Sequence, residues 1–307
     1  MAQSGSNYSA AGEVALVRQR RTWSQNVWRG LKAAPLTAKA GLLIIAAYIF
    51  VAVFAPLLAP YGESEVFPQQ YLPWGDEFLF GTDHLGRDVL TRLLYGARNT
   101  IGIAVATTIL AFAIGGGLGL VAAINRDTWL DQLLSRGVDV LMAIPGLIFA
   151  LMLLSVFGAS ATNLIIIIAV LDSTRVFRLT RAVALNVVVM DYVEAARLRG
   201  EKLGYIMRRE ILPNIMPPLV AEFGLRFCFV FLSIAALSFL GVGIQPPTAD
   251  WGSMVRENAS LIQFAQYDLK AAMTPLLPAA AIALLTVAVN FVVDWFLHKT
   301  SGIKDEK

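Results

Sequence analysis

Five long stretches of the sequence carry no charged residue, and they constrain the fold more than any other feature. They run over 40–62, 99–125, 140–171, 227–249 and 271–293. A helix rises about 1.5 Å per residue, so about 20 apolar residues cross the hydrocarbon core of a bilayer. A buried helix of a soluble protein could explain one such stretch, but not five. The sequence therefore predicts an all-α, polytopic membrane protein.

The third stretch is too long for one span and is predicted to contain a turn. Residues 158–163 are small or polar, as is typical of turns. The helix after this turn must continue past Asp172 to reach the other side. Six spans are predicted, near 40–60, 100–124, 138–157, 163–182, 218–243 and 271–295.

The basic residues beside the spans predict the orientation, because Lys and Arg are enriched in cytoplasmic segments. The tail 1–39 and the segment 183–217 are rich in these residues, whereas 61–98 is mainly acidic. Both termini and 183–217 are therefore expected in the cytoplasm. The bases concerned are Arg18, Arg20, Arg21, Arg29, Lys32, Lys39, Arg197, Arg199, Lys202, Arg208 and Arg209.

Several residue patterns associated with chemistry are missing from the sequence. No GxxxxGK[ST] occurs, so we expect no ATP-hydrolysing P-loop on this chain. Gly115 and Gly119 lie in a predicted span, where small residues let a second helix approach closely. His84 and His298 are expected on opposite sides of the membrane, and Cys228 is expected to be a packing residue. We predict no catalytic residue, no bound cofactor and no metal site.

The segment 183–217 is strongly polar for so apolar a chain. Asp191 is a reasonable N-cap, and Glu194 three residues later resembles a capping box. Ala195 and Ala196 would give this helix a small, smooth side suited to a groove. A second helix is expected to end at Pro213. The plain alternative is a solvated loop that only joins two spans.

The spacing within "EAARLRGEKLGYIMRREILPN" favours a function over the plain loop. A glycine follows Glu194 by six residues, and Ile211 follows it by seventeen. This pattern resembles the EAA signature of bacterial ABC importer permeases. The residues that match it or flank it are Glu194, Ala195, Ala196, Arg197, Gly200, Ile211 and Pro213.

The resemblance implies a type I (MetI-like) permease. In that family the EAA loop is a coupling helix that docks on ATPase subunits carried on separate chains, where ATP and Mg are bound. The implied layout is a tail (1–39), a first span (40–60), an outer loop with an interfacial helix (61–98), a five-helix core (99–297) containing 183–217, and a final tail (298–307). The implied partners are a second permease chain, two ATPases, a periplasmic binding protein and the bilayer of the inner membrane.

Two further stretches resemble the C-type permease of dipeptide, oligopeptide and nickel importers. They are "FGTDHLGRDVLTRLLYGAR" and "GVGIQPPTADWGSMVREN". The first is expected to form an amphipathic helix along the outer surface, with Arg87, Asp88 and Arg92 in water. Trp251 is expected at the headgroup level. Asp83, Arg87, Asp88 and Trp251 could belong to an outer gate or a binding-protein platform, or could be structural anchors only.

Asp172 and Arg175 lie in the stretch 171–175, where members of the family often have a Trp and neighbouring small residues instead. With a span starting near Asn163, Asp172 would lie about 13 Å deep. The two side chains share a helix face and could pair. Charged groups at such depth usually face a cavity or a partner, so a translocation path and a pair with the partner permease both stay open. Glu222 and Arg226 are interpreted as a separate structural pair.

Two other classes of protein are alternatives to an importer permease. An ion-coupled secondary transporter should show repeated halves with broken helices, and no convincing repeat is found. A membrane scaffold would not need the EAA spacing. The solute is not specified by the sequence: peptides are the default, with nickel, opines, glutathione and sugars as alternatives.

Overall fold

The computed structural model describes residue 32 and residues 34–301 of the chain. The chain divides into two units, Met1–Pro35 and Leu36–Lys307, and helices α2 to α12 all belong to the second. Of the bases used to predict the orientation, Arg18, Arg20, Arg21 and Arg29 lie outside the described residues. So does most of the predicted final tail.

The second unit is built from helices. The long ones are α2 (Leu36–Leu58), α3 (Val89–Ile124), α6 (Ala161–Val188), α9 (Leu212–Phe239) and α12 (Leu276–Ser301). The shorter ones are α4 (Trp129–Met142), α5 (Gly146–Phe157), α7 (Asp191–Leu198), α8 (Leu203–Tyr205), the π-helix η1 (Ile206–Ile211), α10 (Trp251–Asn258), the 3₁₀-helix η2 (Ala259–Phe264) and α11 (Leu269–Met273). The predicted all-α class is confirmed.

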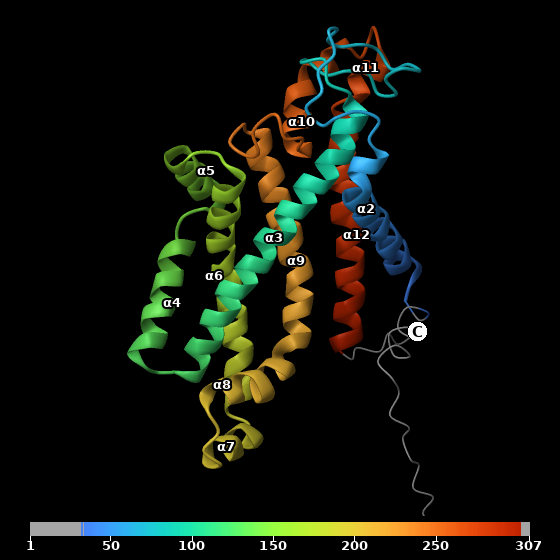
Figure 1. The fold of residues 1–307 in the computed structure, drawn as a ribbon. Helices are drawn as coiled ribbons and strands as arrows, with labels where there is room; N and C mark the ends of the chain where they lie inside the picture. Colours follow the sequence, from blue (N-terminus) through green and yellow to red (C-terminus); the bar gives the residue numbers. More distant parts are fainter. Residues whose placement is uncertain (1–31, 33, 302–307) are drawn as a thin grey trace, which may run out of the picture. The chain divides into compact units, whose positions relative to one another are not determined.

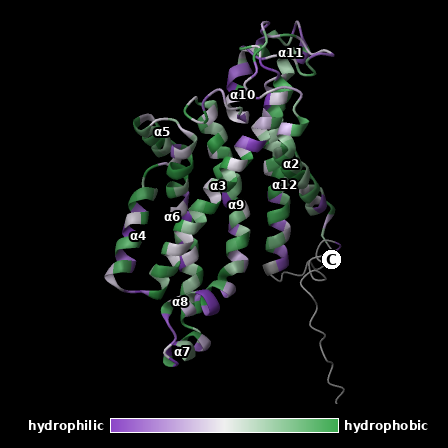
Figure 2. Cartoon of the chain, in the orientation of Figure 1, coloured by the Kyte–Doolittle hydropathy of each residue, from purple (hydrophilic) through white to green (hydrophobic). Residues whose placement is uncertain are grey.

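The long helices form a bundle in which α3 runs diagonally across the others (Figure 1). The most extensive packing joins α3 to α6, and α2 packs against α12 and α3. At one end of the bundle lie α7 and α8, and at the other lie α10 and α11 (Figure 1). Hydrophobic residues predominate along α5, α9 and α12, between more hydrophilic ends (Figure 2).

Four helical segments of the described chain are long and apolar enough to span a membrane, and the number rises to five if a bent pair counts as one span. The four are Leu36–Leu58, Val89–Ile124, Leu203–Phe239 and Leu269–Lys299. Helix α6 is long enough, but it carries Asp172, Arg175, Arg178 and Arg181, which lower its apolar character. The predicted count of six therefore depends on α6 as well as on the bent pair.

The predicted straight span over 138–157 is wrong. Helices α4 and α5 meet at an angle of 87° across a break of three residues. Pro145 stands directly before α5, lacks a backbone donor, and disfavours helical geometry at Ile144. The turn predicted at 158–163 does occur, since α5 ends at Phe157 and Gly158 has a φ of +91°.

The predicted interfacial helix is not a separate element. Asp88 caps α3, accepting a hydrogen bond of 2.7 Å from the Thr91 backbone nitrogen, and the helix then continues without interruption to Ile124. Residues expected to lie along the outer surface therefore form the first turns of a long tilted helix.

Two glycines allow α3 and α6 to touch. A Cβ atom on Gly119 would lie 2.8 Å from the Phe177 carbonyl oxygen and 2.9 Å from Thr180 Cβ. A Cβ atom on Gly115 would clash with the Ser173 carbonyl oxygen. Close backbone approach is the usual role of small residues between membrane helices, so this predicted role is confirmed.

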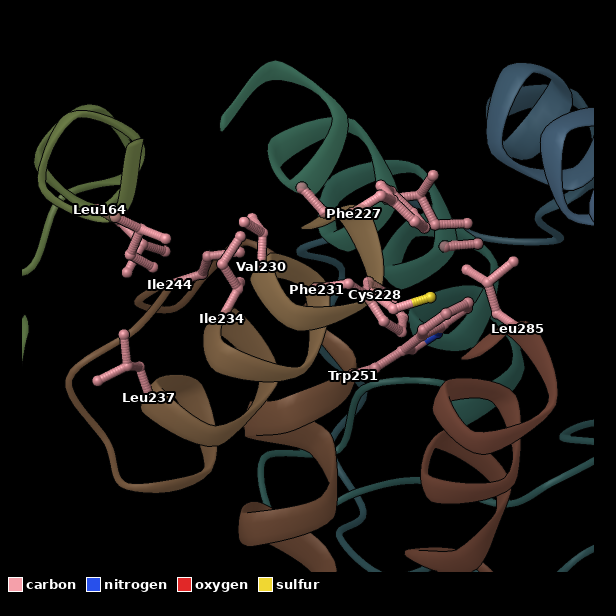
Figure 3. Packing of buried hydrophobic residues seen from close by; sticks show 14 of the residues in the cluster. Leu164, Phe227, Cys228, Val230, Phe231, Ile234, Leu237, Ile244, Trp251 and Leu285 are labelled. Atoms are coloured by element: carbon pink, nitrogen blue, oxygen red, sulfur yellow. The ribbon is translucent and has the colours of Figure 1, made fainter. Parts of the chain in front are cut away.

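The main hydrophobic core joins α3, α9, α10 and α12 (Figure 3). Phe231 and Trp251 meet edge to face, with ring centroids 6.3 Å apart. Cys228 is buried in the same cluster beside Leu285 (Figure 3), as expected of a packing residue.

Candidate functional site

The EAA segment forms a short helix, α7, with a defined C-terminal cap. Gly200 has a φ of +77°, and its nitrogen donates to the Arg197 carbonyl oxygen at 2.9 Å. The Glu201 nitrogen donates to the Ala196 carbonyl oxygen at 3.2 Å. These two bonds are those of a Schellman motif, in which glycine supplies the left-handed residue. The predicted N-cap is displaced by one residue, because Met190 caps α7 without a side-chain bond and Asp191 is its first residue.

One face of α7 packs on the permease itself. Val193 and Ala196 are fully buried against the ends of α3, α6 and η1. Ile211 is fully buried in the same cluster. The prediction that Ala195 and Ala196 form one free, smooth side is therefore wrong for Ala196, which faces the chain's own core. Ala196 and Ile211 hold the segment in place.

The opposite face of α7 is exposed. Glu194, Ala195 and Arg197 lie on it, and Leu198 has 83% of its surface accessible. This face of α7 therefore combines an exposed leucine with exposed charged residues. Arg199, Lys202, Arg208 and Arg209 are also exposed and make this end of the molecule basic.

The prediction that the second helix of the segment ends at Pro213 is wrong. Helix α8, η1 and α9 form one helical run from Leu203 to Phe239. Pro213 is exposed and lies within this run, near the junction of η1 and α9. The π-helical stretch Ile206–Ile211 precedes it, and such local π geometry is frequent at functional sites.

Asp172 and Arg175 belong to a group of four charges between α6 and α9. Asp172 Oδ1 lies 3.5 Å from Arg175 Nη1 and 3.5 Å from Arg226 Nη1. Arg226 Nε lies 2.7 Å from Glu222 Oε1. The predicted pair at Asp172 and Arg175 is present, but Glu222 and Arg226 are not separate from it. Since Arg226 is distant from Asp172 in the sequence, helical spacing gave no indication of this link.

This charged group borders a cavity of about 300 Å³. Its walls come from the bend between α4 and α5, from α6, and from α9. Most lining residues are apolar, and the polar ones are Asp172, Thr174, Arg175 and Ser233. An apolar hollow with a few convergent polar groups is the usual form of a ligand site.

At the other end of the bundle, Asp83, Arg87, Arg92 and Glu257 form a second, buried charged cluster. Arg87 Nη2 lies 2.9 Å from Glu257 Oε2, and Arg87 Nε donates to Asp83 Oδ2 at 2.7 Å. Arg92 lies within 3.5 Å of both carboxylates. The expectation that Arg87, Asp88 and Arg92 lie in water is wrong, because each is almost fully buried. Glu257 was not predicted to be a site residue, although it lies in the second quoted stretch.

Trp251 is also buried, so its ring packs within the protein. Its indole nitrogen donates to the Leu93 carbonyl oxygen at 2.9 Å, and its ring meets Tyr48 edge to face at 5.7 Å. Asp250 accepts a hydrogen bond from Thr100 Oγ1 at 2.9 Å. Helix α10 is thus attached to α3 by the side chains of Trp251 and Asp250.

Two family profiles match the chain, and one of them covers the helices described above. The profile described as "Binding-protein-dependent transport system inner membrane component" matches residues 115–299. This range is more than half of the chain, and it contains α7, the charged group and the cavity. The chain belongs to this family. A second profile, the N-terminal TM domain of oligopeptide transport permease C, matches residues 22–73 and so reaches into the predicted tail.

Several curated relatives are similar over most of their length. The chain is 36% identical to the di/tripeptide transport system permease protein DppC of Pseudomonas aeruginosa, with 84% of this chain and 85% of the relative covered. It is 34% identical to a dipeptide transport system permease protein DppC of Alkalihalophilus pseudofirmus, covering 83% and 82%. It is also 34% identical to the glutathione transport system permease protein GsiD of Escherichia coli, covering 90% and 89%.

Among solved structures, an inward-facing form of the MetNI methionine ABC transporter shares the fold. The TM-score is 0.51 at 17% identity, with 67% of this chain and 96% of that chain covered. The MetI-like fold is confirmed. Family and relatives together establish a multi-pass permease subunit of an ABC importer in the inner membrane.

Proposed function

We propose that this permease imports a small peptide and is driven through α7 by ATPase subunits on separate chains. The observation that carries the proposal is the unbroken helical run from Leu203 to Phe239. It starts beside α7 and, further along, its residues Phe229 and Ser233 line the intramembrane cavity. A displacement of α7 would therefore move a wall of that cavity.

The surface of α7 suits a soluble ATPase partner. Leu198 supplies exposed apolar area, and the basic residues around it supply charges for a partner's carboxylates. Because Val193 and Ala196 fix α7 to the bundle, force applied at the exposed face passes to the spans. ATP and Mg would bind on the partner, and this chain would have no catalysis of its own.

The proposed topology follows from the charges. The basic end with α7 and α8 would be cytoplasmic, and the acidic loop 61–88 would face outward. Both termini would then be cytoplasmic with six spans, counting α6 and the bent pair α4–α5. A second permease chain and a periplasmic binding protein would complete the importer.

The solute class rests on the relatives. Two of them are named for dipeptide or di/tripeptide transport and one for glutathione, which favours a short peptide over nickel, opines or sugars. Asp172 and Arg175 would lie on the translocation path. The cluster of Asp83 and Arg87, together with Asp88 and Trp251, would act as a rigid scaffold beneath the binding protein, because all four side chains are buried.

Site-specific cross-linking tests the docking surface. In a Cys228→Ser background, Leu198→Cys should form a cross-link to an ATPase subunit and should lose ATP-driven uptake once cross-linked. Leu79→Cys is the matched control, since Leu79 is equally an exposed leucine but lies in the acidic loop. A cross-link from position 79 but not from position 198 would contradict both the docking surface and the topology.

A further inference from the structure

A buried carboxylate that lines the cavity has one oxygen without a partner among the described residues. Asp172 has 6% of its surface exposed and lines the cavity. Its Oδ1 atom is shared by Arg175 and Arg226, whereas its Oδ2 atom is buried and accepts no hydrogen bond from any described residue. A buried carboxylate oxygen without a donor is costly, and a cationic ligand group would remove that cost.

Another part of the cavity lining, at the start of α5, is suited to an anion. Helix α5 begins there, with Pro145, Gly146 and Leu147 lining the space, and no side chain caps its first turn. Free backbone N–H groups and the helix dipole favour a negative group at this position. Arg175 lines the same cavity and keeps about half of its side chain exposed, so its guanidinium group is available to a ligand.

The charges of the protein itself also restrict the ligand. Asp172 and Glu222 balance Arg175 and Arg226, so the charged group is neutral as a whole. A ligand with a single charge would leave an uncompensated charge at membrane depth, which is expensive. A ligand with one positive and one negative group would keep the balance.

We propose that this cavity is a binding site for a small zwitterion, with its ammonium group on the Asp172 carboxylate and its carboxylate between Arg175 and the start of α5. The proposal rests on the import function proposed above and specifies its ligand class. The volume of about 300 Å³ lies at the lower limit for ligand sites. It favours a solute of the size of a dipeptide with both termini free.

Protection of a reporter cysteine tests the site in the complete, purified complex. Ser233 lines the cavity, so Ser233→Cys in a Cys228→Ser background reports on its occupancy. The rate of modification by a neutral methanethiosulfonate reagent is measured from the mass of the peptide that carries residue 233. The probes are concentration series of dialanine, N-acetyl-dialanine and dialanine amide. Dialanine should slow the modification, and each blocked form should need about tenfold higher concentration, equivalent to about 1.4 kcal/mol.

Two substitutions separate the two ends of the ligand. Asp172→Asn should abolish the preference for dialanine over its N-acetyl form and keep the preference over the amide. Arg175→Gln should abolish the preference for dialanine over the amide and keep the preference over the N-acetyl form. Asp139→Asn is the matched control, because Asp139 forms an ion pair with Arg178 but does not line this cavity. It should keep both preferences.

The proposal is overturned if dialanine gives no protection, if the three probes protect equally, or if both substitutions change both preferences in parallel. Should Asp172→Asn fail to assemble, the three-probe comparison in the unsubstituted chain decides. ATP-driven uptake is measured on the same preparation. Uptake without protection refutes the site alone, whereas a complex without ATPase chains refutes the proposed function.

Discussion

The indole nitrogen of Trp251 donates a 2.9 Å hydrogen bond to the carbonyl oxygen of Leu93, which joins α10 to the start of α3. Gly96 makes room for the ring, since a Cβ atom there would lie 2.7 Å from Trp251 Cδ1. Trp251 thus fastens α10 to α3 at the end of the bundle opposite α7.

Trp251→Ala should destabilise the protein by about 3 to 5 kcal/mol, because it removes a large buried ring and leaves a cavity. The midpoint temperature of thermal unfolding of the purified complex measures the effect. Trp129→Ala serves as the control, as Trp129 is 74% exposed. Equal shifts in the two variants would argue against a core role for Trp251.

Gly119→Ala should cost about 1 to 3 kcal/mol, because the new methyl group would push α3 away from α6. Gly117→Ala, on the same helix, should be neutral or slightly stabilising. A Cβ atom there meets nothing within 4 Å, and alanine favours helix by up to about 1 kcal/mol over glycine. Thermal unfolding compares the two, and the prediction is wrong if their order is reversed.

Gly200→Ala should weaken the C-terminal cap of α7 by about 1 kcal/mol or more, through the backbone alone. Gly200 has a φ of +77°, and no atom lies within 4 Å of the added Cβ. Faster hydrogen exchange of the α7 amides and reduced ATP-driven uptake are expected. Gly200→Asn should destabilise the cap less than Gly200→Ala does, because asparagine tolerates this conformation. Gly204→Ala is the control, since Gly204 is helical and a Cβ atom there meets only open space.

Glu257→Gln should destabilise the protein by about 3 to 5 kcal/mol, because Arg87 and Arg92 would lose a buried carboxylate. Asp127→Asn removes a carboxylate that pairs with Arg126 but is 92% exposed, so it should cost less than about 1 kcal/mol. The difference in unfolding midpoint measures the contrast. A small effect at Glu257 would mean that the two arginines are stabilised without it.

Four of the six predicted spans and the EAA segment were predictable because their physical causes are local. An uncharged run must leave water wherever it lies in the fold, and Gly200 ends α7 through its own φ angle. The bend between α4 and α5 could have been suspected from Pro145, but its angle depends on packing against α6. The burial of Ala196 also depends on a neighbour, η1, which the segment's own spacing does not reveal.

Arg226 shows most clearly which contacts cannot be predicted from spacing within one helix. Helical spacing paired it with Glu222 on its own helix, whereas its contact with Asp172 comes from α6 lying beside α9. Arg87 and Arg92 were placed in water because they are charged. Glu257, far away in the sequence, supplies the carboxylate that lets them be buried.

The sequence by itself determined the class of the protein, its membrane-spanning runs and the segment that resembles a coupling helix, because hydropathy, charge bias and short-range spacing are properties of contiguous residues. Only the tertiary structure decided which face of α7 is free, which charges are buried together, and that a neutral group of four charges borders a cavity. Those features arise from contacts between residues distant in the sequence, and their energies depend on burial, which exists only once the helices have packed.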